Sequence, residues 1–227
     1  MTRSVLKLQG ITLHTLKFGD YDLIATVFTR DAGVVKLIIK RGLSLKNKSP
    51  ITPLTRAEFV YTTGKGEIHV CKETDVLERY YGNSASLAQL EAGCALAQAI
   101  RNSQMLEKPA PQLYDLFCAF LTMVNHHEDP NKWVCSFLLK VMKHEGMIDT
   151  YSSCGVCHSN IDHVYASRGE GFCKEHSPPQ AIILKKEEVQ LLNLLAHSRS
   201  LNELSSLETS DNFVEKIKIL FKQSLAH

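Results

Sequence analysis

The stretch Cys154-Gly-Val-Cys157 is followed, after fifteen intervening residues, by Cys173-Lys-Glu-His176. In each stretch two metal-binding side chains are separated by two residues, so both can point into one tight backbone turn. Two such turns supply the four ligands of a tetrahedral zinc shell. The spacing therefore predicts one structural zinc ion, bound by Cys154, Cys157, Cys173 and His176.

The residues between the two pairs have the pattern of a β-hairpin. His163-Val-Tyr-Ala-Ser is expected to form one strand, and Arg168-Gly-Glu-Gly171 carries the two glycines that a tight reversal needs. Phe172 leads back toward Cys173. Such a hairpin would return the second pair of ligands to the first.

Several alternatives compete with this interpretation. His158 and His163 are possible fourth ligands, but only His176 repeats the two-residue spacing of the first pair. A disulfide with one thiol left over is possible, although the odd total of seven cysteines and the absence of a secretory signal favour a reducing compartment. The other four cysteines are scattered singly in apolar surroundings and are expected to be inert core thiols: Cys71, Cys94, Cys118 and Cys135.

A zinc ion with a catalytic role is a further, more specific alternative. His126-His-Glu128 precedes Cys154 in an order that loosely resembles the zinc deaminases, in which H-x-E is followed by P-C-x-x-C. However, Ser153 stands where that motif has proline, and the deaminase interpretation gives Cys173 and His176 no role. A metal with four protein ligands also has no open position for water. The sequence therefore favours a structural metal.

The bulk properties indicate a folded chain of two domains. Its 227 residues are 44% hydrophobic, which is enough to bury a sizeable core. No apolar run approaches the roughly twenty residues of a membrane-spanning helix, and the first ten residues are too charged for a signal peptide. A cytoplasmic location is expected.

Positive charge is concentrated in the first part of the chain. Residues 1–80 hold thirteen Lys and Arg against eight Asp and Glu, whereas the remainder is net acidic. No acidic residue occurs from Ala32 to Ala57. This region is the candidate for binding anions, although a solvated charged face would have the same composition.

The first eighty residues are expected to be mostly strand. Five β-branched and aromatic runs are separated by turn residues: Ile11 to Leu16, Leu23 to Thr29, Val34 to Lys40, Leu54 to Thr62 and Glu67 to Lys72. Five strands make a small barrel of the OB-fold type plausible, and residues 1–80 are predicted to be a DNA-binding OB-fold domain.

Alternation along the third run places Lys36 and Lys40 on the outer face, opposite Val35, Leu37 and Ile39. A basic loop from Arg41 to Ser49 follows. The predicted DNA-binding residues are Lys36, Lys40, Arg41, Lys46, Lys48 and Arg56. The aromatic residues of this region, among them Phe18, Tyr21, Phe28, Phe59 and Tyr61, are mostly expected to fill the barrel, so none is assigned to base stacking.

From about Ser84 the hydrophobic period becomes helical. Three stripes are expected to face a core: Leu87, Leu90, Cys94, Ala97 and Ile100; Leu113, Leu116, Phe117, Phe120, Leu121 and Val124; and Trp133, Phe137, Leu138, Val141 and Met142. Two closing helices are expected at Glu187 to Ala196 and Asn212 to Leu225. The fold class is thus multidomain α+β, with residues 81–227 forming an all-α domain that carries an inserted zinc-knuckle hairpin at 151–178.

The order of several stretches resembles a known family. They are Asp20-Tyr-Asp22 through Gly33, the basic segment from Lys40 to Ser49, Leu54 to Leu77 with its glycine turn, and Phe137 to Gly146 leading into Cys154-Gly-Val-Cys157. In this order they are similar to the RecO family of bacterial DNA repair and recombination mediator proteins.

The resemblance implies a non-enzymatic protein that binds single- and double-stranded DNA and anneals complementary strands. It also implies binding to the C-terminal tail of single-strand-binding protein, a site expected within residues 81–227. With RecR, such a protein helps to load RecA onto coated DNA, so RecA is an indirect partner. Association with the nucleoid during repair is expected.

Two features depart from the family pattern. Members that bind zinc commonly have cysteine where this chain has His176, and other members lack the site, so the resemblance implies an architectural zinc. The family's basic segment often has the pattern K-G-x-R-R, whereas this chain has Lys40-Arg41-Gly42 with further charges at Lys46 and Lys48. Two other functions stay open: a zinc-dependent enzyme acting on nucleic acid, and a zinc-ribbon scaffold that binds only proteins.

Overall fold

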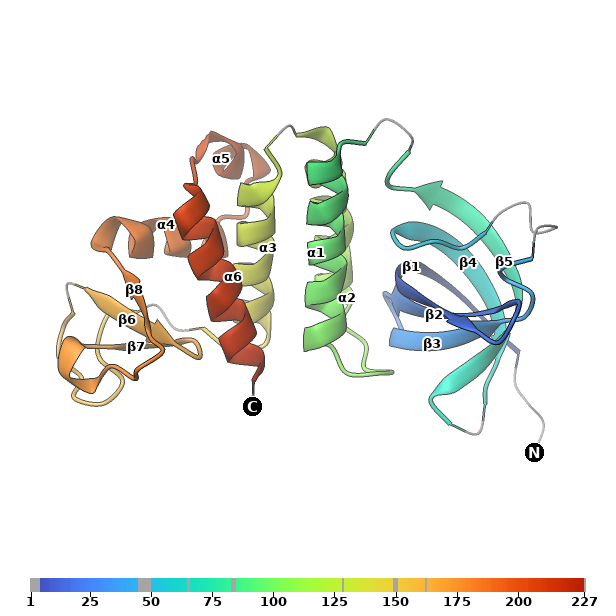
Figure 1. The fold of residues 1–227 in the computed structure, drawn as a ribbon, viewed down its shortest axis with the longest axis horizontal. Helices are drawn as coiled ribbons and strands as arrows, with labels where there is room; N and C mark the ends of the chain where they lie inside the picture. The colour runs from blue at the N-terminus through green and yellow to red at the C-terminus, as the bar shows by residue number, and fades with distance from the viewer. Residues whose placement is uncertain are drawn as a thin grey trace. The chain divides into compact units, whose positions relative to one another are not determined.

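The computed structural model describes residues 5–44, 50–64, 66–82, 85–127, 129–148, 151–161 and 163–226 (Figure 1). The chain divides into two compact units, Met1–Glu128 and Asp129–His227. Among the described residues, the first unit contains a five-stranded sheet and two α-helices, and the second contains four α-helices, a short 3-10 helix and a small sheet. The expected domain boundary at residue 80 stays a prediction. Within the described ranges, no helix has the length and apolar content needed to cross a membrane.

The five expected strands of the first unit are present: β1 (Val5–Phe18), β2 (Asp22–Thr29), β3 (Gly33–Ile39), β4 (Thr55–Thr62) and β5 (Ile68–Arg79). They are hydrogen bonded in the order β1-β2-β3-β5-β4, and β4 also pairs with β1, so the sheet closes on itself. In the described sheet β3 and β5 pair in parallel, whereas the other strand pairs are antiparallel. β1 and β5 are longer than expected because each pairs with one neighbouring strand along its first part and with another along its second part.

The change of partner along β1 occurs at Gly10, which pairs with both Thr29 and Ala57. A Cβ atom at Gly10 would lie 2.5 Å from Val27 Cγ1 and 2.7 Å from the Phe28 carbonyl oxygen. Only glycine fits there without displacing the neighbouring backbone, so this residue allows the sheet to close tightly.

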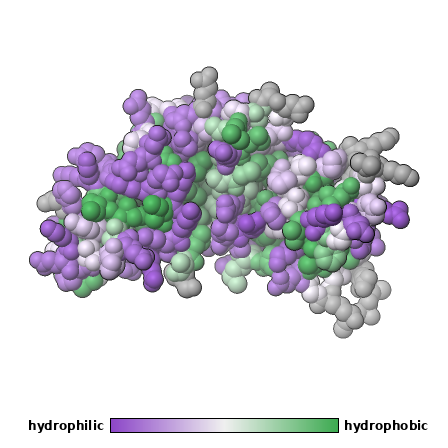
Figure 2. Space-filling view, viewed as in Figure 1, coloured by the Kyte–Doolittle hydropathy of each residue, from purple (hydrophilic) through white to green (hydrophobic). Residues whose placement is uncertain are grey.

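Alternation along β3 gives the expected two faces. Val35, Leu37 and Ile39 are buried in the barrel core, whereas the Lys36 side chain points outward. The core also holds Phe59 and Tyr61, as the sequence indicated. Over the barrel surface, hydrophobic side chains are interspersed with hydrophilic ones (Figure 2).

Two helices complete the first unit. α1 (Leu87–Ser103) begins at Ser86, whose hydroxyl accepts from the Gln89 amide in a capping box, and α2 (Pro111–His126) begins with proline. α2 packs on the barrel through Phe28, whose ring centroid lies 5.5 Å from that of Tyr114, and through the Arg30–Asp115 ion pair.

The predicted stripe of α1 is partly wrong. Leu87, Leu90 and Cys94 are exposed, and the helix instead buries a face rich in small residues: Ala92, Gly93, Leu96, Ala97, Ala99 and Ile100. The reason is packing against Tyr81, since a Cβ atom at Gly93 would lie 2.4 Å from the Tyr81 hydroxyl. The prediction that Cys94 is a core thiol is therefore also wrong. Cys71 and Cys135 are buried, and Cys118 is half-buried.

The second unit is built on α3 (Asn131–His144), whose predicted stripe is fully buried, with Trp133 at its centre. The expected closing helices are α4 (Lys186–His197) and α6 (Asp211–Leu225). Three short elements lie between or before them and were not predicted: the 3-10 turn η1 (Lys174–His176), β8 (Ile182–Leu184) and α5 (Leu201–Ser206). Ser136 donates to the Leu195 carbonyl at 2.8 Å, which ties α4 to α3 within the core.

The predicted hairpin consists of β6 (Val164–Ser167) and β7 (Glu170–Phe172), with β8 on the other side of β6. Arg168 and Gly169 form its two-residue turn, and both have positive φ angles of 50° and 82°. This is the turn geometry that best matches the twist of antiparallel strands. Gly169 is required because a Cβ atom there would overlap the Met147 carbonyl.

Candidate metal centre and nucleic-acid interface

The first cysteine pair lies in a tight backbone knuckle. The His158 amide donates to the Cys154 carbonyl at 2.9 Å, and the Cys154 amide donates to the Ser159 carbonyl at 2.9 Å. The Gly155 amide donates to the Gly171 carbonyl at 2.9 Å, so the knuckle is attached to β7. Because Cys173 directly follows β7, this attachment fixes the two ligand pairs relative to each other.

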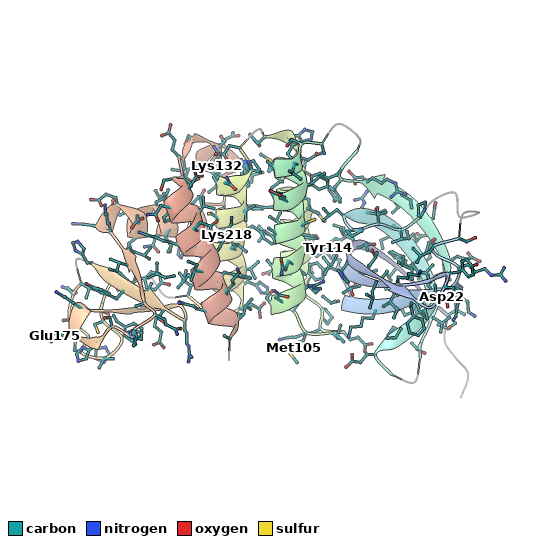
Figure 3. The ribbon with its side chains drawn as sticks, in the orientation of Figure 1. Asp22, Met105, Tyr114, Lys132, Glu175 and Lys218 are labelled. Atoms are coloured by element: carbon teal, nitrogen blue, oxygen red, sulfur yellow. The ribbon has the colours of Figure 1, made fainter. Side chains whose placement is uncertain are left out.

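The second pair is spaced by η1, in which the His176 amide donates to the Cys173 carbonyl at 3.2 Å. Glu175, within this turn, lies at the hairpin end of the second unit (Figure 3). One helical turn brings residues three apart onto the same side. The Cys173 sulfur and the His176 ring therefore face the same point.

The structure brings the four predicted ligands together. Their candidate ligand atoms all lie within 4.8 Å of one another. The Sγ atoms of Cys157 and Cys173 are 4.0 Å apart, and His176 Nδ1 lies 3.8 Å from Cys154 Sγ and 3.2 Å from Cys173 Sγ. With Zn–S bonds of about 2.3 Å and Zn–N bonds of about 2.1 Å, a tetrahedral shell places sulfurs about 3.8 Å apart and a sulfur and nitrogen about 3.6 Å apart. The observed spacings fit such a shell.

Local hydrogen bonds favour the thiolate form that a metal requires at Cys154 and Cys157, whereas burial and the neighbouring Cys154 sulfur raise the pKa of Cys173. Backbone amides of Cys157 and then Cys173 donate to the Cys154 sulfur and hold its pKa below the ordinary value. The side chain and amide of Ser159 lower the pKa of Cys157. All seven cysteines lie in the described part of the chain, and all are free thiols. The disulfide alternative therefore does not hold in this structure.

The competing ligands lie outside the cluster. His158 and His163 are both exposed, and neither belongs to the group of close ligand atoms. His158 occupies a left-handed backbone position, with φ of 57°, at the end of the knuckle. Glu128, the acidic residue of the deaminase alternative, lies outside the described residues. His126 is the last residue of α2, in the first unit.

The basic residues of the barrel are placed outward, but acidic residues from neighbouring strands reach them. Lys36 Nζ lies 3.0 Å from Glu67, Lys40 Nζ lies 2.7 Å from Asp22, and Arg56 Nε lies 3.4 Å from Glu78. The acid-free run from Ala32 to Ala57 did not predict these pairs, because the acids come from β2, β5 and the turn before β5. Asp22 is marked on the barrel in Figure 3.

Arg41 follows Lys40 in a left-handed conformation, with φ of 55°, and its amide donates to Asp22 Oδ1 at 2.9 Å. The hydrogen bond from Lys40 and then that from the Arg41 amide lower the pKa of Asp22. Lys46 and Lys48 lie outside the described residues. The structure therefore groups Lys40 and Arg41 around Asp22, while Arg56 lies on a different strand, β4.

Known proteins match along nearly the whole chain. The family model described as Recombination protein O N terminal matches residues 1–80, and that described as Recombination protein O C terminal matches residues 85–226. A DNA repair protein RecO from Chlamydia muridarum is 29% identical over 223 residues, covering 96% of this chain and 95% of the relative.

Two further relatives carry the same name. That of Chlamydia pneumoniae is 28% identical over 216 residues, covering 93% of this chain and 85% of the relative. That of Acetivibrio thermocellus is 26% identical over 221 residues, covering 93% and 87%. The N-terminal model covers the five-stranded sheet, and the C-terminal model covers the cysteine cluster. Because both models match, in the same order along the chain, the chain belongs to the RecO family of DNA repair proteins.

Proposed function

We propose that this protein is a DNA repair and recombination mediator that binds single- and double-stranded DNA through the outer surface of an OB-fold barrel. The closed strand order β1-β2-β3-β5-β4 supports the OB-fold assignment. Its role is to anneal complementary strands and, with RecR, to help load RecA onto DNA coated with single-strand-binding protein. It acts by binding and positioning DNA, not by catalysis.

The observation that carries the proposal is the outward placement of Lys36 on β3 and the exposure of Lys40, which directly follows β3, with Arg41 next to it. Lys36 and Lys40 are ion-paired, but their side chains stay 35% and 62% exposed. Exposed ion pairs contribute only about 0–1 kcal/mol. A DNA phosphate can therefore replace the carboxylate partner at small cost, and each phosphate contact gains free energy by releasing counterions. Lys46 and Lys48 are proposed to extend the same basic surface, and Arg56, which lies on β4, is proposed as a further contact.

We propose further that Cys154, Cys157, Cys173 and His176 bind one zinc ion. Four protein ligands leave no position for a water nucleophile, which supports an architectural role. Bound zinc would join the knuckle to the end of β7 and so fix the hairpin in the second unit. The described part of residues 151–178 contains few large buried side chains, among them Tyr151 and Val164, so a metal would supply stability that packing does not.

The proposed protein partners are RecR and the acidic, hydrophobic-ended C-terminal tail of single-strand-binding protein. We place the tail site within residues 81–227, where an apolar pocket flanked by cations would suit it. RecA is reached indirectly through the DNA. The proposed location is cytoplasmic, with association to the nucleoid during repair.

Strand annealing tests this function directly. Complementary oligonucleotides coated with single-strand-binding protein are mixed with and without the purified protein, and duplex formation is followed over time. The mediator proposal predicts faster annealing when the protein is present. An unchanged annealing rate, in a protein that binds DNA, would contradict the proposal and favour a different role in repair.

A further inference from the structure

Two aromatic side chains of the first unit are exposed at the turn between β1 and β2. Phe18, the last residue of β1, is 50% exposed, and Tyr21, next to the start of β2, is 63% exposed. Gly19 makes the reversal between them with a φ of 62°. The barrel aromatics Phe28 and Phe59 are fully buried. The expectation that such residues mostly fill the barrel therefore does not hold for this pair.

Hydrogen bonds hold this turn against the basic segment. The Leu43 amide donates to the Tyr21 carbonyl at 2.9 Å. Asp22, which is the β-ladder partner of Phe18, accepts from Lys40 Nζ at 2.7 Å and from the Arg41 amide at 2.9 Å. The exposed rings and the two cations are therefore parts of one local structure.

A small polar notch lies beside Lys40 and Arg41. The pairing between β3 and β5 ends at Ile39 and Cys71, and the notch lies just beyond this point. The notch has a volume of about 200 Å³, and its lining includes three cations, Lys40, Arg41 and Lys72, with one carboxylate, Glu73. A water molecule occupies roughly 30 Å³ in the liquid. The notch thus has room for a phosphate group with part of its hydration, and Lys72 is a cation that the sequence did not single out.

We propose that this end of the barrel is a subsite for single-stranded DNA, in which Phe18 and Tyr21 stack on bases while Lys40, Arg41 and Lys72 bind a phosphate. The inference rests on the proposed DNA-binding function and assigns it new residues. Bases in a duplex are already stacked on each other, so only a single strand can offer free base faces to the rings. The subsite therefore distinguishes single strands from duplexes, whereas the phosphate contacts serve both.

The test uses the full chain and two probes, an unstructured thymidine oligonucleotide and a duplex of equal length. Phe18→Ala combined with Tyr21→Ala is expected to lower single-strand affinity by roughly ten-fold or more, since each base–aromatic stack is strong. Duplex affinity stays within two-fold. The slope of log affinity against log salt also stays unchanged, because stacking releases no phosphate counterions.

Two control variants isolate the aromatic ring. Tyr21→Phe keeps the stacking face and is expected to bind single strands like the parent protein. Leu77→Ala removes a different exposed apolar side chain, 43% exposed on β5, and is expected to have no effect. Equal loss for single strands and duplexes in the double variant would overturn the proposal, as would no loss for either.

Lys72→Gln tests the phosphate notch separately. It is expected to weaken binding of both probes and to reduce the single-strand salt slope by about 0.7. An unchanged slope would remove Lys72 from the subsite. If the aromatic variants bind normally while Lys36→Gln, which lies outside the subsite, weakens binding, only the subsite fails. If neither the aromatic variants nor Lys36→Gln changes DNA affinity, the barrel is not the DNA-binding surface, and the proposed function fails with it.

Discussion

The barrel and the cysteine hairpin achieve order in opposite ways. The barrel closes around a continuous core that includes Leu37, Phe59 and Tyr61, and its charged groups lie outside. The hairpin has strands of only four and three residues, and its polar and sulfur ligands turn inward toward one point. A closed sheet of this size buries enough apolar area to be stable by itself, whereas a short hairpin does not.

This difference suggests that the hairpin residues have a structural role and that the charged residues of the barrel surface have a binding role. We propose that Cys154, Cys157, Cys173 and His176 stabilise the hairpin by binding a metal, so we assign these groups to the fold and not to catalysis. Side chains that could bind DNA lie on the barrel exterior, where their removal costs little stability. The following predictions test the division, beginning with the largest expected effect.

Removing one ligand of the cysteine cluster should abolish metal binding. Cys157→Ser replaces a thiolate with a neutral hydroxyl, and zinc binding by small folded sites is worth about 10–16 kcal/mol in apparent free energy. The purified parent protein should contain about one zinc per chain and the variant close to none. Elemental analysis measures this, and proteolysis within residues 151–178 should become faster.

The matched controls are His158→Ala and His163→Ala, both of which should keep the metal. Loss of zinc in either variant would move the fourth ligand away from His176. A freshly purified parent protein without zinc would remove the metal proposal altogether.

A cavity in the barrel core should destabilise the barrel and leave the cysteine hairpin unaffected. Phe59 is fully buried, and Phe59→Ala should destabilise the barrel by about 3–5 kcal/mol. Denaturant titration, monitored by a probe in the first unit, would measure the loss. Zinc content should stay at the parent value; a parallel loss of zinc would show that the two regions do not fold independently.

Asp22→Asn should have a smaller effect, and it should raise DNA affinity instead of lowering it. Asparagine keeps an oxygen for the Arg41 amide but removes the charge paired with Lys40. DNA affinity at neutral pH should rise by roughly two- to five-fold, the range of an exposed ion pair. An unchanged or lower affinity would show that Lys40 does not contact phosphate.

The same variant has a defined pH signature. The pKa of Asp22 is lowered from its ordinary value of 3.8, mainly by the hydrogen bond from Lys40. A depressed carboxyl pKa stabilises the fold at pH above the unfolded value, and this contribution is lost as the pH falls through the folded pKa. Stability curves of the parent and Asp22→Asn proteins should therefore converge in acid. A stability difference between the two proteins that persists when Asp22 is protonated would have another cause.

Much of this structure could be predicted from local patterns. The period of two placed all five strands of the barrel and the outward direction of Lys36. Spacing alone selected Cys154, Cys157, Cys173 and His176, because each pair is confined to a turn whose geometry depends on adjacent residues. The hairpin turn at Arg168 and Gly169 was likewise indicated by its glycines.

Features that depend on distant neighbours could not be predicted. The ion pairs of Lys36 and Lys40 join different strands, so the sequence of β3 alone does not contain them. The exposed side of α1 was misassigned because close packing at Gly93 favours the small-residue face over the larger Leu87 and Leu90. The notch beside Lys72 arises where β3 and β5 stop pairing, which only the closed sheet reveals.

The salt dependence of DNA binding tests the central claim most directly. Lys36→Gln combined with Lys40→Gln removes two proposed phosphate contacts from exposed positions, without introducing new negative charge. For a single strand, each contact contributes about 0.7 to the slope of log affinity against log salt. The account predicts a slope reduced by about 1.4 and weaker binding to every sequence alike. A double variant that keeps both the affinity and the slope of the parent would contradict it.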